Sequence, residues 1–460
     1  MIDPACAPRP DHLAGFVVFV LVLGAAVPAS AQPAPGTATP GDPPAPAAVA
    51  ANPDGFRFHG YLRSGFGVNG NGKAFEPFRA PNADAKYRLG NEAEAYLETT
   101  FDYGLTPEQD PGAFFDTRIT VSYVTPTSRS NTFDTTVALR EAWALARGVW
   151  KAQPEATFWA GERFYDRHDL HMSDFYYRDM SGFGGGIEGI AAGDRARLAV
   201  AWIGGAIDEL DPNGSVPDEE QYRFDKNTFD ARLSGMAMGR TTLTLAVDVS
   251  HFNGDIVTNP DGDLVFEDGL GLAGSLMLER PFAWGRNKLS AHVGTGPASN
   301  FRGVFSAPTG RIYQPGETVD TSDPWQVRLV NDLIVEPRPR WSVLLGAVYQ
   351  EQDTGAATGS RLRWISLGAR PGYHFSPYVG IKAEAGWDYT DQDDGPAGSL
   401  FKLTLAPQIT PHLTALSRPA IRAFATWARW SDDFVGLVAP LAYAGQNAAF
   451  SAGVQLETWW

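Results

Sequence analysis

Residues 451–460, SAGVQLETWW, end the chain with alternating apolar and polar side chains. Successive side chains of a β-strand point to opposite sides, so these residues divide between two faces. One face holds Val454, Leu456, Thr458 and Trp460, and the other holds Gln455, Glu457 and Trp459. An alternating strand that ends in an aromatic residue is typical of transmembrane β-barrels, whose aromatic residues gather at the membrane interface. The alternative is an edge strand of a soluble sheet.

The same period of two recurs along the chain, for example in 241–252, 288–296, 378–389 and 399–407. In water, each apolar face would pack against a second sheet, whereas in a barrel it faces lipid and the polar face lines a lumen. At roughly 20–25 residues per strand with its loop, the chain after position 55 allows about 16–20 strands. Barrels of that size leave an aqueous channel. We predict an all-β transmembrane barrel over residues 55–460.

The first residues predict export. Residues 13–28 are apolar, uncharged and too short to span a bilayer comfortably as a helix. Ala29, Ser30 and Ala31 follow as a small-residue cleavage site, so we expect residues 1–31 to be a signal peptide. Residues 32–54 consist mainly of Pro, Ala and Gly and cannot bury enough surface to fold. We expect them to form a flexible leader before the barrel.

Composition excludes several classes of function. The only cysteine, Cys6, lies in the predicted signal peptide, so the mature chain is expected to have no disulfide and no thiolate metal site. The formal charge of -16 argues against nucleic acid as a partner. The sequence has no internal repeat at a fixed period, which disfavours a soluble propeller or solenoid.

Four aromatic residues lie on the polar faces of predicted strands: Tyr61, Tyr96, Trp364 and Trp459. An aromatic ring in a water-filled channel is unfavourable unless it contacts a ligand. A sugar has apolar C–H faces that stack on such rings, and its hydroxyl groups need the donors of arginine and the acceptors of carboxylates. The pattern therefore indicates a carbohydrate path, and barrel closure would bring Tyr61 beside Trp459. The alternative places these rings in the interface girdle or beneath loops.

Residues 161–180, GERFYDRHDLHMSDFYYRDM, are too polar for a core and too aromatic for an ordinary solvated loop. One hypothesis is a metal site on His168 and His171, with Asp169 and Asp174 as oxygen ligands. However, His-x-x-His outside a helical motif is a weak indication of zinc, and the chain contains no G-x-S-x-G motif. We predict no metal, no cofactor and no catalytic residue, and we expect both histidines to hold the loop against the barrel wall by hydrogen bonds.

A soluble protein that binds or hydrolyses glycans is a further alternative. A hydrolase of this kind needs two opposed carboxylates in a cleft. The alternation instead predicts one strand over 86–101, with Glu92, Glu94 and Glu98 on a single face. Carboxylates in that arrangement suit a channel wall better than a catalytic cleft.

Several segments together have a familiar pattern. They are FHGYLRSGFG (58–67), KYRLGNEAEAY (86–96), ALREA (138–142), WAGERFYDRHDLHMSDFYYRDMSG (159–182), SRPAIRAFATWARW (417–430) and the terminal WW. These segments resemble the maltoporin family, the carbohydrate-specific outer-membrane porins. They extend from the first predicted strand to the last residue, so the resemblance covers 55–460, and the segment 159–182 is long and specific.

The resemblance implies a barrel of about 18 strands that forms a homotrimer and has its third loop folded into the channel. It also implies a row of aromatic residues, the slide, flanked by a polar track. The slide positions are Tyr61, Tyr96, Trp364 and Trp459. The constriction positions are Tyr176, Arg167, Asp169 and Asp174. The polar track positions are Arg63, Arg88, Glu98 and Arg140.

The chain departs from the family pattern at three places. The second loop, 125–136, has no tryptophan to reach a neighbouring subunit, and Phe133 is the nearest candidate for that role. A further slide aromatic is missing near 288–293, where Leu289 or His292 stands instead. Ala93 occupies the position of a cysteine that forms a first-loop disulfide in some members.

We predict an outer-membrane channel in a Gram-negative bacterium. By resemblance, its solutes are maltose and maltodextrins, which diffuse passively along the slide and polar track. Sucrose or other glucosides remain possible solutes, as does general porin activity. The expected partners are maltooligosaccharides or related sugars, outer-membrane lipid and two further copies of the chain.

Overall fold

The structure is a computed structural model that describes residues 54–126, 136–207, 224–257 and 262–460. The chain divides into two units, Met1–Pro43 and Pro44–Trp460, and all described residues belong to the second. The predicted signal peptide and nearly all of the predicted leader lie outside the described residues, and so does Phe133.

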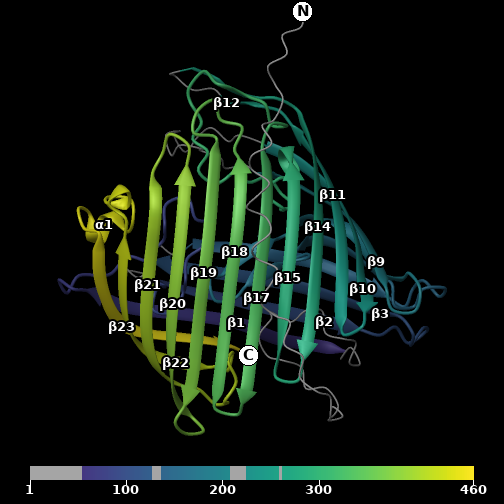
Figure 1. Cartoon of the computed structure of the whole chain (residues 1–460). Helices are drawn as coiled ribbons and strands as arrows, with labels where there is room; N and C mark the ends of the chain where they lie inside the picture. The colour runs from purple at the N-terminus through teal and green to yellow at the C-terminus, as the bar shows by residue number, and fades with distance from the viewer. Residues whose placement is uncertain (1–53, 127–135, 208–223, 258–261) are drawn as a thin grey trace, which may run out of the picture. The chain divides into compact units, whose positions relative to one another are not determined.

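The described residues form an 18-stranded antiparallel sheet that closes into a barrel (Figure 1). Its strands are β1 (Gly55–Asn69), β2 (Glu94–Leu105), β3 (Phe114–Pro126), β4 (Thr136–Arg147), β5 (Thr157–Arg163), β8 (Gly182–Ala191), β9 (Arg197–Ile207), β10 (Phe224–Met238), β11 (Thr241–Asn253), β14 (Gly269–Phe282), β15 (Gly285–Thr295), β17 (Trp325–Arg338), β18 (Trp341–Asp353), β19 (Arg361–His374), β20 (Val379–Gln392), β21 (Ala397–Ile409), β22 (Ala420–Trp430) and β23 (Ala448–Trp459). Each strand pairs with its neighbour in sequence, and β1 pairs with β23 to close the sheet. The predicted barrel is confirmed, and Tyr61 lies opposite Trp459 at the closure.

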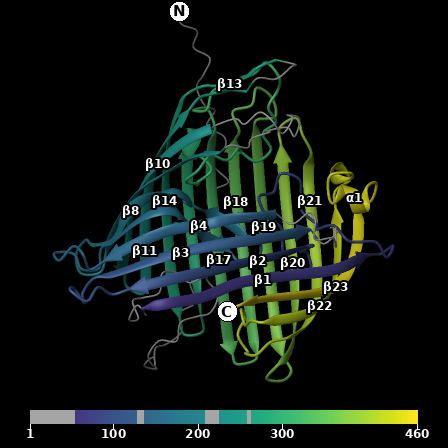
Figure 2. The ribbon, with the colours of Figure 1, turned by 180° about the vertical axis from the view of Figure 1, so that it is seen from behind.

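The side chains of the strands alternate between an apolar outer face and a polar inner face. On β21, Phe401, Leu403 and Leu405 are exposed, whereas Lys402 and Thr404 between them are buried. This is the reverse of a soluble protein and matches a wall with lipid outside. The strands tilt as barrel closure requires, so β1–β4 run across the direction of β15–β21 on the opposite wall (Figure 2).

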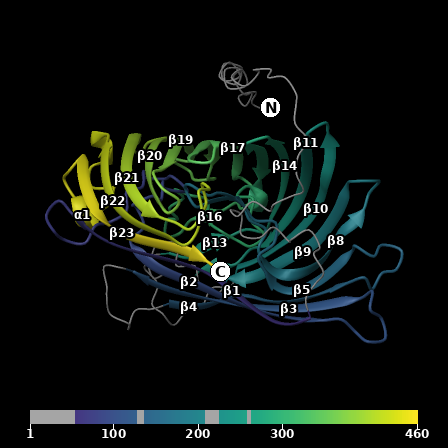
Figure 3. The same ribbon diagram turned by 90° about the horizontal axis from the view of Figure 1, so that it is seen from below.

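The connections differ between the two ends of the barrel. At the end where β1 begins and β23 finishes they are short, for example 239–240, 283–284 and 339–340. At the other end most are long, and these contain β6 (His168–Leu170), β7 (Phe175–Arg178), β12 (Ile256–Val257), β13 (Leu264–Phe266), η3 (Gly296–Ala298), β16 (Thr318–Val319), η4 (Asp432–Phe434) and α1 (Pro440–Tyr443). Seen along the barrel, the connecting segments occupy much of the interior (Figure 3). No helix of the described residues is long and apolar enough to cross a membrane.

The predicted strand over 86–101 is wrong in its first half, because β2 begins only at Glu94. Residues 70–93 form a first loop that folds into the barrel. The ring of Tyr87 fills a slot over Gly368 and Gly386, which face each other on β19 and β20. A Cβ at either glycine would lie 2.1 Å from this ring. Tertiary packing thus removes 86–93 from the sheet, although these residues continue the alternation.

We expect Gly386→Ala to destabilise the barrel by about 1–3 kcal/mol, because the added methyl group overpacks the Tyr87 slot. The measurement is urea unfolding of the detergent-folded protein, followed by tryptophan fluorescence. Gly70→Ala is the matched control, since a Cβ there has no neighbour within 4 Å. Equal stability of the two variants would contradict the packing of Tyr87 against this pair of glycines.

Candidate functional site

The third loop, residues 164–181, connects β5 to β8 and lies inside the barrel. Its chain folds back as a small hairpin of β6 and β7, in which Asp169 pairs with Tyr176. One side of the hairpin is apolar: Leu170, Met172, Phe175 and Tyr177 are buried in a cluster with wall residues of β17–β19. This packing places the loop against one wall and leaves its other side facing β1, β2 and β4.

A buried arginine fixes the loop to the wall. Arg178 is completely inaccessible, and its guanidinium donates to Asp248 at 2.6 Å and to Asp230 at 2.7 Å, on neighbouring strands β11 and β10. Its Nε donates to Asp166 at 2.6 Å, at the start of the loop itself. The ion pairs with these aspartates offset most of the free energy that the Arg178 guanidinium loses when it leaves water. Burying the arginine or any one of the aspartates alone would be costly. Sequence reasoning missed Arg178, because nothing local distinguishes it from other charges of the loop.

The first loop holds the third loop from a second side. The backbone N–H of Arg88 donates to the carbonyl of Met172 at 3.2 Å. Leu89 is held in turn by the wall: its N–H donates to Glu384 at 3.0 Å, and Lys402 Nζ donates to its carbonyl at 2.8 Å. Two inward-folded loops therefore fill the half of the interior next to β17–β21.

The space between the third loop and strands β1, β2 and β4 is the open side of the barrel interior. Half-buried, partly accessible side chains line it. From the barrel wall these are Tyr61, Arg63, Glu94, Tyr96 and Glu98, together with the exposed Arg140. From the third loop they are Phe164, Arg167, Asp169, Asp174 and Tyr176. We call this set the lining cluster. It contains the four predicted constriction residues and adds Glu94 and Phe164, whereas Trp364, Trp459, Arg88 and Phe133 of the predicted slide and polar track are not part of it.

Two aromatic rings of the lining cluster lie side by side. The ring centroids of Tyr61 and Tyr96 are 6.1 Å apart across the β1–β2 pair. The guanidinium of Arg63 lies 5.0 Å from the Tyr96 ring. Trp459 is half-buried and lies beside Tyr61 on the other side, on β23. These rings come from three adjacent strands of one wall.

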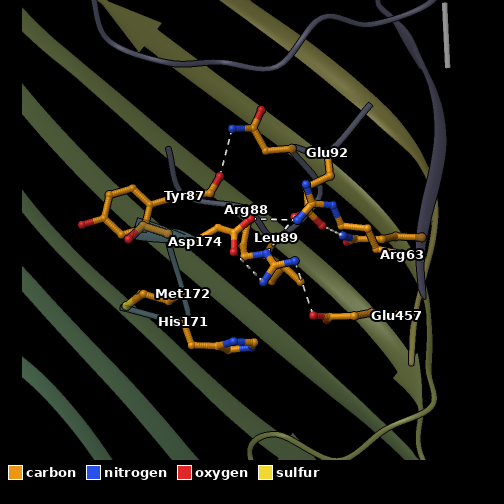
Figure 4. Close-up of polar contacts among 12 residues, drawn as sticks. Arg63, Tyr87, Arg88, Leu89, Glu92, His171, Met172, Asp174 and Glu457 are labelled. Atoms are coloured by element: carbon orange, nitrogen blue, oxygen red, sulfur yellow. Dashed lines mark hydrogen bonds and ion pairs between the residues drawn. The ribbon is translucent and has the colours of Figure 1, made fainter. Parts of the chain in front are cut away.

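Charged groups of both signs lie together beside the lumen, with Arg63 and Arg88 next to Glu92, Asp174 and Glu457 (Figure 4). Arg63 donates to Glu94 at 2.7 Å and to Asp174 of the third loop at 2.8 Å. Arg88 donates to the Tyr61 hydroxyl at 2.7 Å, and that hydroxyl donates to Glu457 at 3.3 Å. The polar groups beside each ring are thus already oriented by partners, which reduces the entropy lost when a solute binds.

A stacked arginine, Arg167, directly precedes the hairpin of the third loop. The Arg167 guanidinium lies 3.9 Å from the Phe164 ring centroid and 4.1 Å from that of Tyr176. The guanidinium of Arg140, at a bulge in β4, lies 5.4 Å from the ring centroid of Phe164, which directly follows the neighbouring strand β5. The bulge turns Arg140 inward, because two residues of one strand there face one of its partner. Phe164 has no distinguishing sequence pattern, which is why sequence reasoning did not find it.

The ionisation of the loop follows from these contacts. Burial by itself would raise the pKa of Asp174, but the charges of Arg88 and Arg63 outweigh it and lower the pKa to about 2. Burial lowers the pKa of His171 well below its ordinary value, and the nearby Arg88 adds to this effect. Asp174 is therefore a carboxylate and His171 a neutral imidazole at neutral pH.

Two expected positions differ from the sequence interpretation. Trp364 is only 1% exposed, because Phe175 of the third loop packs edge-on against it at 5.0 Å. Its indole N–H donates to Asp388, so the ring belongs to the packed wall and is not an accessible platform. Arg88 lies in the first loop and is 5% exposed, so it supports the lining from behind. In both cases an inward loop covers the residue.

The two histidines of the third loop make hydrogen bonds, but the partners are not residues of the barrel strands, against which the loop was expected to be held. His168 contacts Asp166 at 3.0 Å, and His171 contacts Arg418 at 3.2 Å. Within the described ranges, His, Asp and Glu residues form no group suited to a metal ion. His292, at a position where the family pattern has an aromatic residue, is buried and bonds to Ser275 at 2.8 Å.

A family model described as LamB porin matches residues 56–460. The chain belongs to the LamB porin family. It is an outer-membrane β-barrel, and the short connections therefore face the periplasm. Among solved structures, it is similar to OmpF of Salmonella typhi, with 9% identity, a TM-score of 0.43 and coverage of 88% of this chain and 97% of that one.

Two further solved outer-membrane proteins are similar to this chain to about the same extent in sequence identity, coverage and TM-score. DcaP of Acinetobacter baumannii is 12% identical with a TM-score of 0.46, over 88% of this chain and 98% of that one. OpdK of Pseudomonas aeruginosa is 12% identical with a TM-score of 0.44, over 88% of this chain and 99% of that one. As a member of a porin family, the protein is an outer-membrane channel.

We expect Arg178→Met to release the third loop, because it leaves Asp166, Asp230 and Asp248 without their shared partner. Breaking a buried ion pair from one side typically costs about 3–5 kcal/mol. The measurement is single-channel conductance in a planar bilayer, which should rise and become noisy. Arg195→Met, in an exposed periplasmic turn, serves as the control. A folded Arg178→Met channel with unchanged, quiet conductance would show that Arg178 does not hold the loop.

The low pKa of Asp174 predicts how the constriction responds to acid. Because its folded pKa of about 2 lies below the ordinary 3.8, its ion pairs stabilise the loop at every pH above that ordinary value. They are lost as the pH falls toward 2. Conductance should therefore stay constant from neutral pH to about pH 4 and change only below it. Asp174→Asn should lack that acid-dependent step, and a transition near neutral pH that disappears in this variant would contradict the assignment.

Proposed function

We propose that this porin is a sugar-selective channel for passive diffusion of maltose and maltodextrins across the outer membrane. The observation that supports it best is the pair of half-buried rings, Tyr61 and Tyr96, whose centroids are 6.1 Å apart on the open side of the lumen. Aromatic rings that remain accessible to water in a channel are favourable only when a solute covers them.

The chemistry of the lining cluster suits a glucosyl chain. The C–H faces of glucose are apolar and stack on tyrosine rings, while its hydroxyl groups extend sideways. Arg63 and Arg167 offer donors, and Glu94, Glu98 and Asp174 offer acceptors beside the rings. Each contact is weak and the next one is close, so a sugar can enter, advance and leave. No energy source is required for such transfer.

The accessible aromatic path is short. Trp364 is covered by Phe175, so the path consists of Tyr96, Tyr61 and Trp459, with Tyr176 and Phe164 across from it on the third loop. A short path binds few glucosyl units at once. We therefore expect affinity to rise with chain length only over the first few units and then to level off.

Two alternatives concern the solute. Sucrose or another glucoside needs the same combination of rings and charges, and a general porin needs only the open lumen. The ordered ring pair favours a sugar over a general solute, because a general porin gains nothing from it. The protein is proposed to act as a homotrimer, as the family resemblance implies.

The decisive experiment is ion conductance of the purified protein in a planar bilayer, with maltotriose to maltoheptaose titrated in. We expect conductance steps in groups of three that close saturably with sugar. Tyr61→Ala and Tyr96→Ala should each weaken this block by roughly fivefold to tenfold, by analogy with the strength of aromatic stacking pairs.

Tyr103→Ala is the matched control, because Tyr103 lies on the same strand as Tyr96 but is 55% exposed on the outer face. This variant should bind sugar like the wild type. Open channels that ignore every maltooligosaccharide would rule out the maltodextrin assignment. Block by sucrose but not by maltooligosaccharides would support the glucoside alternative.

A further inference from the structure

The periplasmic connection between β21 and β22, residues 410–419, folds into the barrel end. The N–H of Ala415 donates to Glu336 of β17 at 2.6 Å, although β18, β19 and β20 lie between that strand and β21. Lys382 of β20 donates to the carbonyl of Ala415. Ala415 and Leu416 are buried against Ile334 and Leu344, and Trp459 packs against the same cluster. We call this connection the inward turn.

Arg418 ends the inward turn and contacts two other parts of the channel. Its guanidinium lies 4.7 Å from the ring centroid of Trp459 and 2.5 Å from the carboxylate of Glu457, both on β23. The same guanidinium is 3.2 Å from Nε2 of His171 in the third loop. Its side chain is 1% exposed, so these contacts are made without competition from water.

The geometry fixes the orientation of Trp459. A guanidinium over one face of an indole is attracted by the π-electrons of the ring, and the planar fork also pairs with Glu457. Trp459 is half-buried and lies opposite Tyr61 at the closure of the barrel. The contact with His171 joins this end of the path to the constriction.

We propose that Arg418 is a positioning residue for transport, which holds Trp459 as the periplasmic end of the sugar path and ties it to the third loop. This inference rests on the proposed sugar-channel function and extends it. Arg418 acts through Trp459 and is separated from the lumen by it. Its effect is therefore confined to sugars long enough to reach Trp459 while they still occupy Tyr61 and Tyr96.

The test compares Arg418→Gln, Arg418→Lys and wild type in planar bilayers, with maltose and maltoheptaose as probes. In Arg418→Gln the concentration of maltoheptaose that half-blocks the channel should rise roughly fivefold to tenfold, and that of maltose should change by less than about twofold. Arg418→Lys keeps the charge but loses the flat stack and fork, so an intermediate loss is expected. Arg340→Gln, in an exposed turn at the same end, is the matched control.

The possible outcomes separate the two proposals. Equal weakening for maltose and maltoheptaose would assign Arg418 a general structural role and overturn the inference. Unchanged maltoheptaose block in Arg418→Gln, with normal block in wild type, would overturn it while leaving the sugar channel intact. A wild-type channel that no maltooligosaccharide blocks would overturn the proposed function, and the inference with it. Selective loss of maltoheptaose block would support both.

Discussion

The position of the third loop depends on one buried ionic contact. Arg178 has no access to water, and Asp166, Asp230 and Asp248 surround it within hydrogen-bonding distance. Charges buried in this way are tolerated only when every member of the group remains paired. The loop therefore has one favourable position, against β10 and β11. The side chains that the loop directs toward the lumen, from Arg167 to Tyr176, are therefore positioned by this contact.

The two inward loops divide the barrel interior into a filled half and an open half. On the filled side, Tyr87 and Phe175 pack against β19 and β20, and the polar side chains of that wall bond to loop backbone. On the open side, Tyr61, Tyr96 and Arg63 remain partly accessible. The inner faces of the two walls are both polar, but they have different partners. Loop backbone groups take the place of water on the filled side, whereas side chains on the open side remain accessible to water.

The lining cluster combines rigid placement with weak binding. Arg63 holds both Glu94 and Asp174, and Arg167 lies between the rings of Phe164 and Tyr176. These partners fix the donors and acceptors before a solute arrives, so little order is lost on binding. When the solute leaves, each donor or acceptor can re-form its hydrogen bond or ion pair with its protein partner. This arrangement suits passage through a channel better than tight retention.

The barrel, its inner and outer faces and its closure beside Tyr61 could be predicted from the sequence, because strand alternation is a local property with a period of two. The residues of the lining could be named from the family resemblance and the alternation together, and most of them do meet on the open side. Three features emerge only from the folded chain: Phe175 covers Trp364, Arg88 lies in a loop, and Arg178 anchors the constriction. Alternation assigns a side chain to a face, but what covers that face depends on loops whose contacts are distant in sequence.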